Sequence, residues 1–174
     1  MQGKLQQSYR VSKELGQNSE FEGSLTLSQM PRLSSLVIPG EAKINIRFEF
    51  TKNLYQHPSI SGHIETRLSL ECQRCLEPMA QIMDFDFDLL IDASDEDVKA
   101  FQTDTLVSDG GYIDIVEVVE DELILALPLI SMHEDISCHQ NWQPDELPEP
   151  EEANNNPFAA LAALKGKRTE DGQQ

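Results

Sequence analysis

The chain has 174 residues, of which 31 are acidic and 13 are Lys or Arg, and its formal net charge is -18. Between Asp84 and Glu152 there are 21 acidic residues and a single basic one, Lys99, so this block repels phosphate groups, argues against direct nucleic-acid binding there, and favours basic proteins as partners. No apolar run approaches the roughly 20 residues of a membrane span, the N-terminus lacks the apolar core of a secretory signal, and three cysteines do not form a disulfide framework, so we expect a cytoplasmic protein.

The first half of the chain has the period-two alternation that is typical of strands. Residues 21–27 predict a short strand, and residues 28–36 predict one or two helical turns with Ser28 as cap and Pro31 at an early position. Clear alternation of apolar and polar residues then follows in three stretches: 42–51, 60–71 and 79–91. Because only short connections separate these stretches, the sequence predicts an antiparallel meander.

The pattern changes to helical spacing after the third stretch. Residues 94–101 predict a helical turn capped by Ser94, with acidic residues at its start. Residues 113–127 have apolar side chains three and four positions apart and predict an amphipathic helix, which Pro128 ends. The expected fold class is therefore α+β: an antiparallel β-meander sheet with one main amphipathic helix, an acidic linker and a short C-terminal helix.

We expect three parts along the chain. Residues 1–140 form a single α+β domain, residues 141–156 form an acidic flexible linker, and residues 157–174 form a short C-terminal helix and tail. One side of that helix is apolar and ends on a lysine, and it either fills a groove on a partner or packs on its own domain. The residues expected on this side or next to it are Phe158, Leu161, Leu164 and Lys165.

A C-x-x-C motif, Cys72 to Cys75, is expected at the tip of the hairpin between the second and third long strands. We favour a purely structural turn there. A zinc site is an alternative, in which Cys138 with His139 or His133 supplies the other ligands. A redox pair is the least favoured alternative, because a strand and not a helix N-terminus follows the motif.

Acidic residues mark two further surfaces. Those at 84–88 alternate with apolar residues and are expected on the solvent face of a strand. A second group lies mostly on the polar side of the predicted helix and is our candidate docking surface for a basic ribosomal or ribosome-assembly protein. Its members are Glu117, Glu120, Asp121 and Glu122. No motif of a catalytic site is found, so we expect no enzyme and no small-molecule substrate.

Direct RNA binding is a second hypothesis for the function. It requires four basic residues of the meander to gather on one face, away from the acidic block. Alternation places the first two of them on the same side of one strand. The four residues are Lys43, Arg47, Arg67 and Arg74.

Three stretches together resemble the bacterial YceD family, the large ribosomal RNA subunit accumulation proteins. They are LECQRCLEP at 70–78, VEDELILALP at 119–128 and NPFAALAALK at 156–165. The resemblance implies a cytoplasmic, non-enzymatic accessory factor needed for accumulation of 23S ribosomal RNA, with no established cofactor. A thiol- or zinc-dependent regulator is a third hypothesis.

Overall fold

The computed structural model describes residues 5–139 apart from residues 18–19, 54–55 and 102, and for His139 it describes the backbone alone. The predicted linker at 141–156 and the predicted C-terminal helix at 157–174 lie outside the described residues, so the three-part division stays a prediction. What is described has the α+β composition expected from the sequence.

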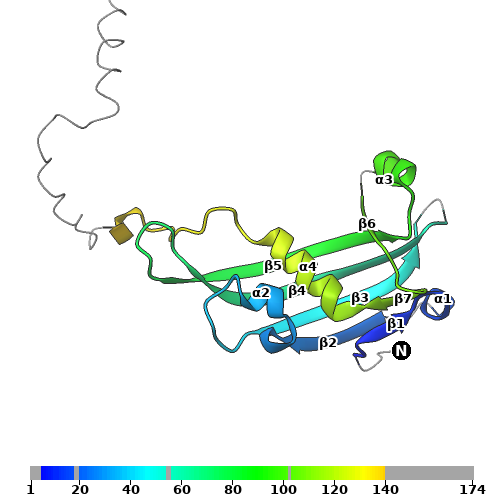
Figure 1. The fold of residues 1–174 in the computed structure, drawn as a ribbon, viewed down its shortest axis with the longest axis horizontal. Helices are drawn as coiled ribbons and strands as arrows, with labels where there is room; N and C mark the ends of the chain where they lie inside the picture. The colour runs from blue at the N-terminus through cyan, green and yellow to red at the C-terminus, as the bar shows by residue number, and fades with distance from the viewer. Residues whose placement is uncertain (1–4, 18–19, 54–55, 102, 140–174) are drawn as a thin grey trace, which may run out of the picture. The chain divides into compact units, whose positions relative to one another are not determined.

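A five-stranded sheet runs through the described residues (Figure 1). Its strands lie in the order β2-β3-β4-β5-β6, and neighbours are antiparallel except β5 and β6, which are parallel. The strands are β2 Glu20–Thr26, β3 Lys43–Lys52, β4 Pro58–Glu71, β5 Pro78–Ile91 and β6 Asp104–Leu106. The three long alternating stretches of the sequence are β3, β4 and β5, so the predicted meander is confirmed.

Alternation along β3 separates the two faces of the sheet. Ile44, Ile46, Phe48 and Phe50 are buried, while the residues between them are exposed. Removing four large apolar side chains from water on one face is a main driving force for this strand, at about 1.5–3 kcal/mol for each. The acidic residues of β5 fall on the exposed face, as the sequence predicted.

Helix α4, Ile115–Ala126, lies across the buried face of the sheet (Figure 1). Val119 and Leu123 are fully buried, and the Asp114 carboxylate accepts a hydrogen bond from the backbone N–H of Val116 at 2.8 Å. The predicted helix at 113–127 is therefore present but begins two residues later. The reason is that Ile113 belongs to a strand, β7, which brings Asp114 to the capping position.

Two short helical turns follow β2: η1, Leu27–Gln29, and α2, Pro31–Ser34. The prediction of Pro31 at the first helical position is confirmed, but the prediction of Ser28 as cap is wrong. Thr26 caps η1 instead, and Gln29 Oε1 accepts a hydrogen bond from the Thr26 N–H at 2.9 Å. Thr26 and Gln29 form a capping box, in which the side chain of each accepts a hydrogen bond from the backbone N–H of the other. A lone Ser28 cap would satisfy only one such N–H group.

Helix α3, Asp95–Phe101, is capped by Ser94 as predicted, since Ser94 Oγ accepts a hydrogen bond from the Asp97 N–H at 3.3 Å. A last helical turn, η2, covers Ile136–His139. Within the described ranges, no helix has the length and apolar content needed to cross a membrane.

Several short elements carry no signal in the sequence. Strand β1, Ser8–Arg10, pairs antiparallel with β7, Tyr112–Asp114, in a separate two-stranded sheet, and α1, Val11–Glu14, follows directly. Strand β6 is also three residues long. Three residues cannot display a period, so these elements depend on pairing with distant segments and not on local pattern.

Candidate functional site

Cys72 and Cys75 lie in the tight turn between β4 and β5, the hairpin tip that the sequence predicted. The turn is closed by two backbone hydrogen bonds, from the Cys72 N–H to the Glu77 carbonyl at 3.0 Å and from the Leu76 N–H to the Cys72 carbonyl at 2.8 Å. Leu76 has a φ of 63°, which is costly for a residue with a side chain. This turn holds both sulfur atoms on the same side of the tip.

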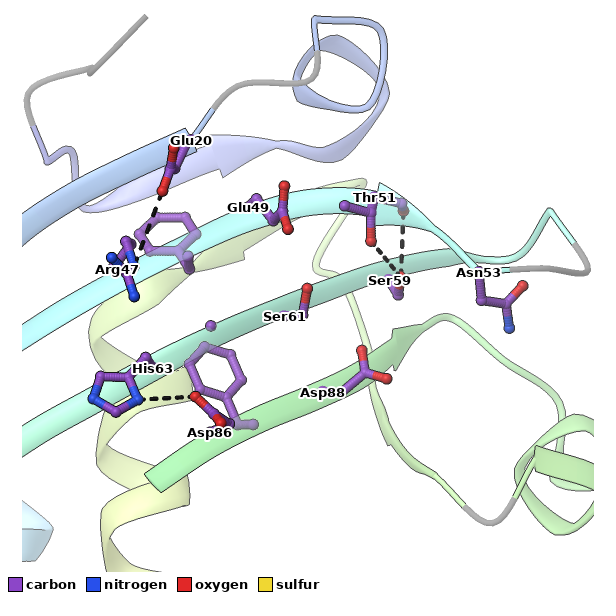
Figure 2. Close-up of a pocket in the computed structure, with 13 residues that line it drawn as sticks. Glu20, Arg47, Glu49, Thr51, Asn53, Ser59, Ser61, His63, Asp86 and Asp88 are labelled. Carbon is purple, nitrogen blue, oxygen red and sulfur yellow. Dashed lines mark hydrogen bonds and ion pairs between the residues drawn. The ribbon is translucent and has the colours of Figure 1, made fainter. Parts of the chain in front are cut away.

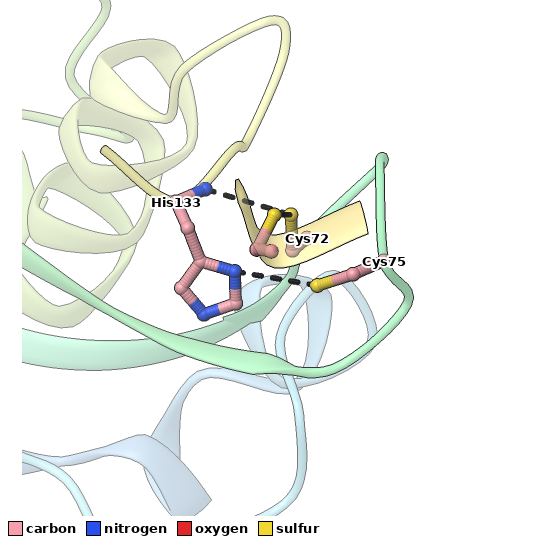
Figure 3. Close-up of side chains that lie close together, drawn as sticks. Cys72, Cys75 and His133 are labelled. Carbon is pink, nitrogen blue, oxygen red and sulfur yellow. Dashed lines mark hydrogen bonds between the residues drawn. The ribbon is translucent and has the colours of Figure 1, made fainter. Parts of the chain in front are cut away.

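The segment that follows α4 brings two more possible metal ligands to this turn, His133 and Cys138. Figure 3 shows His133 beside Cys72 and Cys75. His133 Nδ1 lies 3.3 Å from Cys75 Sγ, and Cys138 Sγ lies 4.0 Å from Cys72 Sγ. One ligand atom from each of the four residues falls within 4.8 Å of every other. Three sulfurs and one imidazole nitrogen therefore lie in one cluster.

Arg74, between the two cysteines of the motif, ties the same two segments together. Its Nε donates to Cys138 Sγ at 3.0 Å, and its Nη2 donates to the carbonyl oxygens of His133 and Asp135 at 2.8 and 2.7 Å. The guanidinium thus lies against the sulfur cluster, where its charge stabilises thiolates.

The two thiols of the hairpin titrate differently. Burial acts to raise the pKa of Cys72, but hydrogen bonds from the backbone N–H groups of Cys75, His133 and Arg74 outweigh it and lower the pKa to about 5. At Cys75 the Glu77 N–H acts to lower the pKa, yet burial and the two neighbouring cysteines raise it above its ordinary value. The cluster thus favours a thiolate at Cys72 first.

The sequence favoured a structural turn at Cys72 and Cys75. In the alternative of a zinc site, Cys138 was a third ligand, and His133 or His139 was left open as the fourth. The geometry brings His133 into the cluster, while the side chain of His139 lies outside the described residues. The spacing of His133 and Cys138 could have favoured His133 in the sequence. Two residues five apart on an irregular segment can direct their side chains to one point, whereas the side chains of the adjacent Cys138 and His139 diverge.

Of the four acidic residues predicted to form a docking face on α4, Glu120 is only 4% exposed. Its Oε1 accepts hydrogen bonds from the backbone N–H groups of Arg32 and Leu33 at 2.7 and 3.0 Å, and its Oε2 from Arg32 Nε at 3.0 Å. Because α2 begins at Pro31, Glu120 acts as the N-terminal cap of α2 from another helix. Glu120 is therefore structural and not part of an exposed face.

The other three acids of that face differ from one another. Glu117 is exposed, and Asp121 is half-exposed but pairs with Arg32 Nη1 at 2.6 Å. Glu122 is partly buried, and its pKa is raised by burial and by repulsion from Asp104 and Asp121. An exposed acidic surface on α4 thus consists mainly of Glu117 and Asp121.

Exposed apolar side chains recur from the end of α4 onward. We call residues 125–136 the apolar segment, because Leu125, Leu129, Ile130 and Ile136 in it are 75%, 97%, 60% and 75% exposed. A hollow of about 830 Å³ lies between the end of this segment and β5. It is lined by Met79, Ala80, Gln81, Ile82, Met132, His133, Glu134, Asp135 and Cys138.

Of the four basic residues proposed for RNA binding, three lie on the same exposed face of the sheet and the fourth does not. Lys43, Arg47 and Arg67 are exposed on the sheet, but Arg74 is engaged at the cysteine cluster. The register also places an acid beside one of the basic residues, since Arg47 lies opposite Glu22 on the neighbouring strand. His63 lies opposite Arg47 on the other side.

His63 stands between two aspartates on this exposed face of the sheet. Its Nδ1 lies 2.8 Å from Asp86 Oδ1 (Figure 2), and its Nε2 lies 3.3 Å from Asp84 Oδ1. Arg47 Nε likewise lies 4.0 Å from Glu20 Oε1. The face is a mixture of both charges and has no continuous basic strip.

The residues named on the predicted C-terminal helix lie outside the described residues, so their role stays a prediction. They are Phe158, Leu161, Leu164 and Lys165.

Comparison with known proteins places the chain in a family. The model of the family described as "Large ribosomal RNA subunit accumulation protein YceD" matches residues 60–165. The chain is 31% identical over 161 residues to the large ribosomal RNA subunit accumulation protein YceD of Haemophilus influenzae, covering 89% of this chain and 92% of that protein. No solved structure matches. The chain belongs to the YceD family.

Proposed function

We propose that this protein is a cytoplasmic, non-enzymatic accessory factor that supports accumulation of 23S ribosomal RNA in the large ribosomal subunit by binding a basic ribosomal or ribosome-assembly protein. The family match over residues 60–165 supports the ribosomal role, because both the family and the matched relative are described as large ribosomal RNA subunit accumulation proteins. The net charge of -18 supports a basic partner.

The apolar segment supports the manner of binding. A partner held by charge alone dissociates readily at cellular salt, whereas buried apolar anchors supply most of the binding energy in protein interfaces. Leu129 and Ile136 are large, exposed anchors, and Glu134 and Asp135 add negative charge between them. A basic protein with its own apolar side chains matches this surface better than RNA does.

The test is affinity capture with the full chain in moderate salt, followed by mass spectrometry, and measurement of 23S ribosomal RNA in cells that carry each variant. One variant combines Leu129→Ser with Ile136→Ser. Its matched control is Val107→Ser, which changes a 79% exposed apolar residue outside the apolar segment. We expect the double variant to lose basic ribosomal or assembly proteins and to lower 23S ribosomal RNA, with the control unchanged.

A second pair tests the charge. Glu134→Lys should weaken capture more as salt is lowered, whereas Asp88→Lys on the exposed face of the sheet should not. Capture of no basic ribosomal or assembly protein by the wild-type chain, or equal capture by all variants, contradicts the proposal. An electrophoretic shift of 23S fragments at physiological salt that is lost in Lys43→Glu with Arg47→Glu would favour direct RNA binding instead.

A further inference from the structure

Four side chains from two distant parts of the chain converge at the hairpin tip. Cys72 and Cys75 come from the β4–β5 turn, and His133 and Cys138 come from the segment after α4, about sixty residues later. We propose that these four residues bind one Zn²⁺ in a closed, structural site that fastens the segment after α4 to the hairpin. This proposal is independent of the partner proposed above.

Two of the separations match those of tetrahedral zinc, and the other pairs of ligand atoms lie within 4.8 Å. Bond lengths of about 2.3 Å to sulfur and about 2.0–2.1 Å to nitrogen place two sulfur ligands about 3.8 Å apart, and a sulfur and a nitrogen about 3.5 Å apart. The Cys72 and Cys138 sulfurs lie 4.0 Å apart, and Cys75 Sγ lies 3.3 Å from His133 Nδ1. Both distances need adjustments of only a few tenths of an ångström.

The surroundings fit the charge of such a centre. Zinc with three thiolates carries a formal charge of -1, and the Arg74 guanidinium beside Cys138 offsets it. The backbone N–H of His133 also donates to Cys72 Sγ at 3.5 Å. Such a hydrogen bond stabilises a metal-bound thiolate. Soft sulfur ligands with one imidazole select zinc over magnesium or calcium, which prefer oxygen.

A disulfide fits this cluster less well. Any pair of these cysteines leaves the third thiol and His133 without a role, and the Cys72 and Cys138 sulfurs are about 2 Å farther apart than in a disulfide. With all four positions taken by protein, no site remains open for a substrate, which is the arrangement of structural zinc and not of catalytic zinc.

The experiment measures metal in the full-length chain, purified without a metal-affinity step and dialysed against a weak chelator under reducing conditions. We expect one zinc per chain by elemental analysis. Replacement by Co²⁺ should produce the absorption of tetrahedral cobalt with strong sulfur charge-transfer bands. Removal of zinc by a strong chelator should lower the melting temperature, and added zinc should restore it.

Variants assign the ligands. His133→Asn and Cys138→Ser should lower zinc affinity at least tenfold, while His133→Cys, which keeps four ligands, should retain one zinc. His139→Asn tests the neighbouring histidine, and His63→Asn is the matched control on the exposed sheet face. Both should retain one zinc per chain.

Three results would overturn the proposal. They are a wild-type chain that takes up no stoichiometric zinc after reconstitution, a disulfide as the stable form in the reduced cytosol, and unchanged zinc affinity in His133→Asn. If a ligand variant fails to fold, the cobalt spectrum of the wild-type chain still decides, because its charge-transfer intensity reports the number of bound thiolates.

Discussion

The carboxylate of Glu120 offers the sharpest test of how α2 and α4 are held together. It accepts two backbone hydrogen bonds from the first turn of α2 and pairs with the Arg32 side chain, all within 3.0 Å. Replacing Glu120 by Ala leaves the N–H groups of Arg32 and Leu33 without acceptors. Each unsatisfied buried donor costs about 1–3 kcal/mol, and loss of a buried ion-pair partner typically costs about 3–5 kcal/mol.

The Arg32 side chain is 54% exposed and regains water when Glu120 is removed, so the ion-pair term is largely offset. We therefore expect a total of about 3–4 kcal/mol, mainly from the two backbone N–H groups. Glu120→Gln should cost less, about 1–3 kcal/mol, since an amide oxygen still accepts both N–H groups but the charge is lost. Asp121→Asn removes an exposed partner of the same arginine and should cost less than about 1 kcal/mol.

Urea unfolding at neutral pH and thermal melting measure this series. At roughly 3 °C for each kcal/mol in a domain of this size, Glu120→Ala should melt roughly 10 °C below wild type. If Glu120→Ala is no less stable than Asp121→Asn, the carboxylate does not cap α2 and the reasoning is refuted. This outcome also matters for docking experiments. Charge reversal at Glu120 would destabilise the fold, so a loss of partner binding in that variant would not identify a docking surface.

Two further predictions concern stability. Burial and repulsion from Asp104 and Asp121 raise the pKa of Glu122 in the folded state. The contribution of Glu122 to the free energy of unfolding is therefore greatest below its unfolded pKa and falls as pH rises through the raised value. At pH 7 the Glu122→Gln variant should therefore unfold at a higher urea concentration than wild type, with a gain in the free energy of unfolding of less than about 1 kcal/mol. At about pH 3 the variant and wild type should be equally stable. A variant that is less stable than wild type at pH 7 argues against this. Gly62→Ala should cost about 1–3 kcal/mol, since its new Cβ would lie 2.5 Å from a carbonyl oxygen of β3, while Gly40→Ala, with 4.0 Å of clearance, should melt as wild type does; equal melting of both contradicts the packing.

The sheet and the main helix could be predicted because their patterns are local. Period-two alternation over ten or more residues identifies β3, β4 and β5, and spacing of three and four identifies α4. The parallel pairing of β6 and the pairing of β1 with β7 have no such signal, since they are contacts between three-residue segments far apart in the chain.

The candidate site could be predicted only in part for a similar reason. The C-x-x-C turn is visible because the hairpin that carries it is visible, and Cys138 is the only other cysteine. The choice of His133 over its alternative depends on how the segment after α4 turns back, which no periodicity describes. Glu120 looks like a surface acid on a helical wheel, and only the arrival of α2, 88 residues away in sequence, makes it a cap.

The two long-range contacts have a joint consequence for the apolar segment. Glu120 ties α4 to α2 before the segment begins, and the cysteine cluster ties the chain to the hairpin where the segment ends. Leu125, Leu129 and Ile130 lie between these ties and face solvent. A surface held at both ends loses less conformational entropy on binding than a free loop does. If the proposed zinc is bound, its removal should release one end of the segment and weaken capture of the proposed partner while the sheet stays folded.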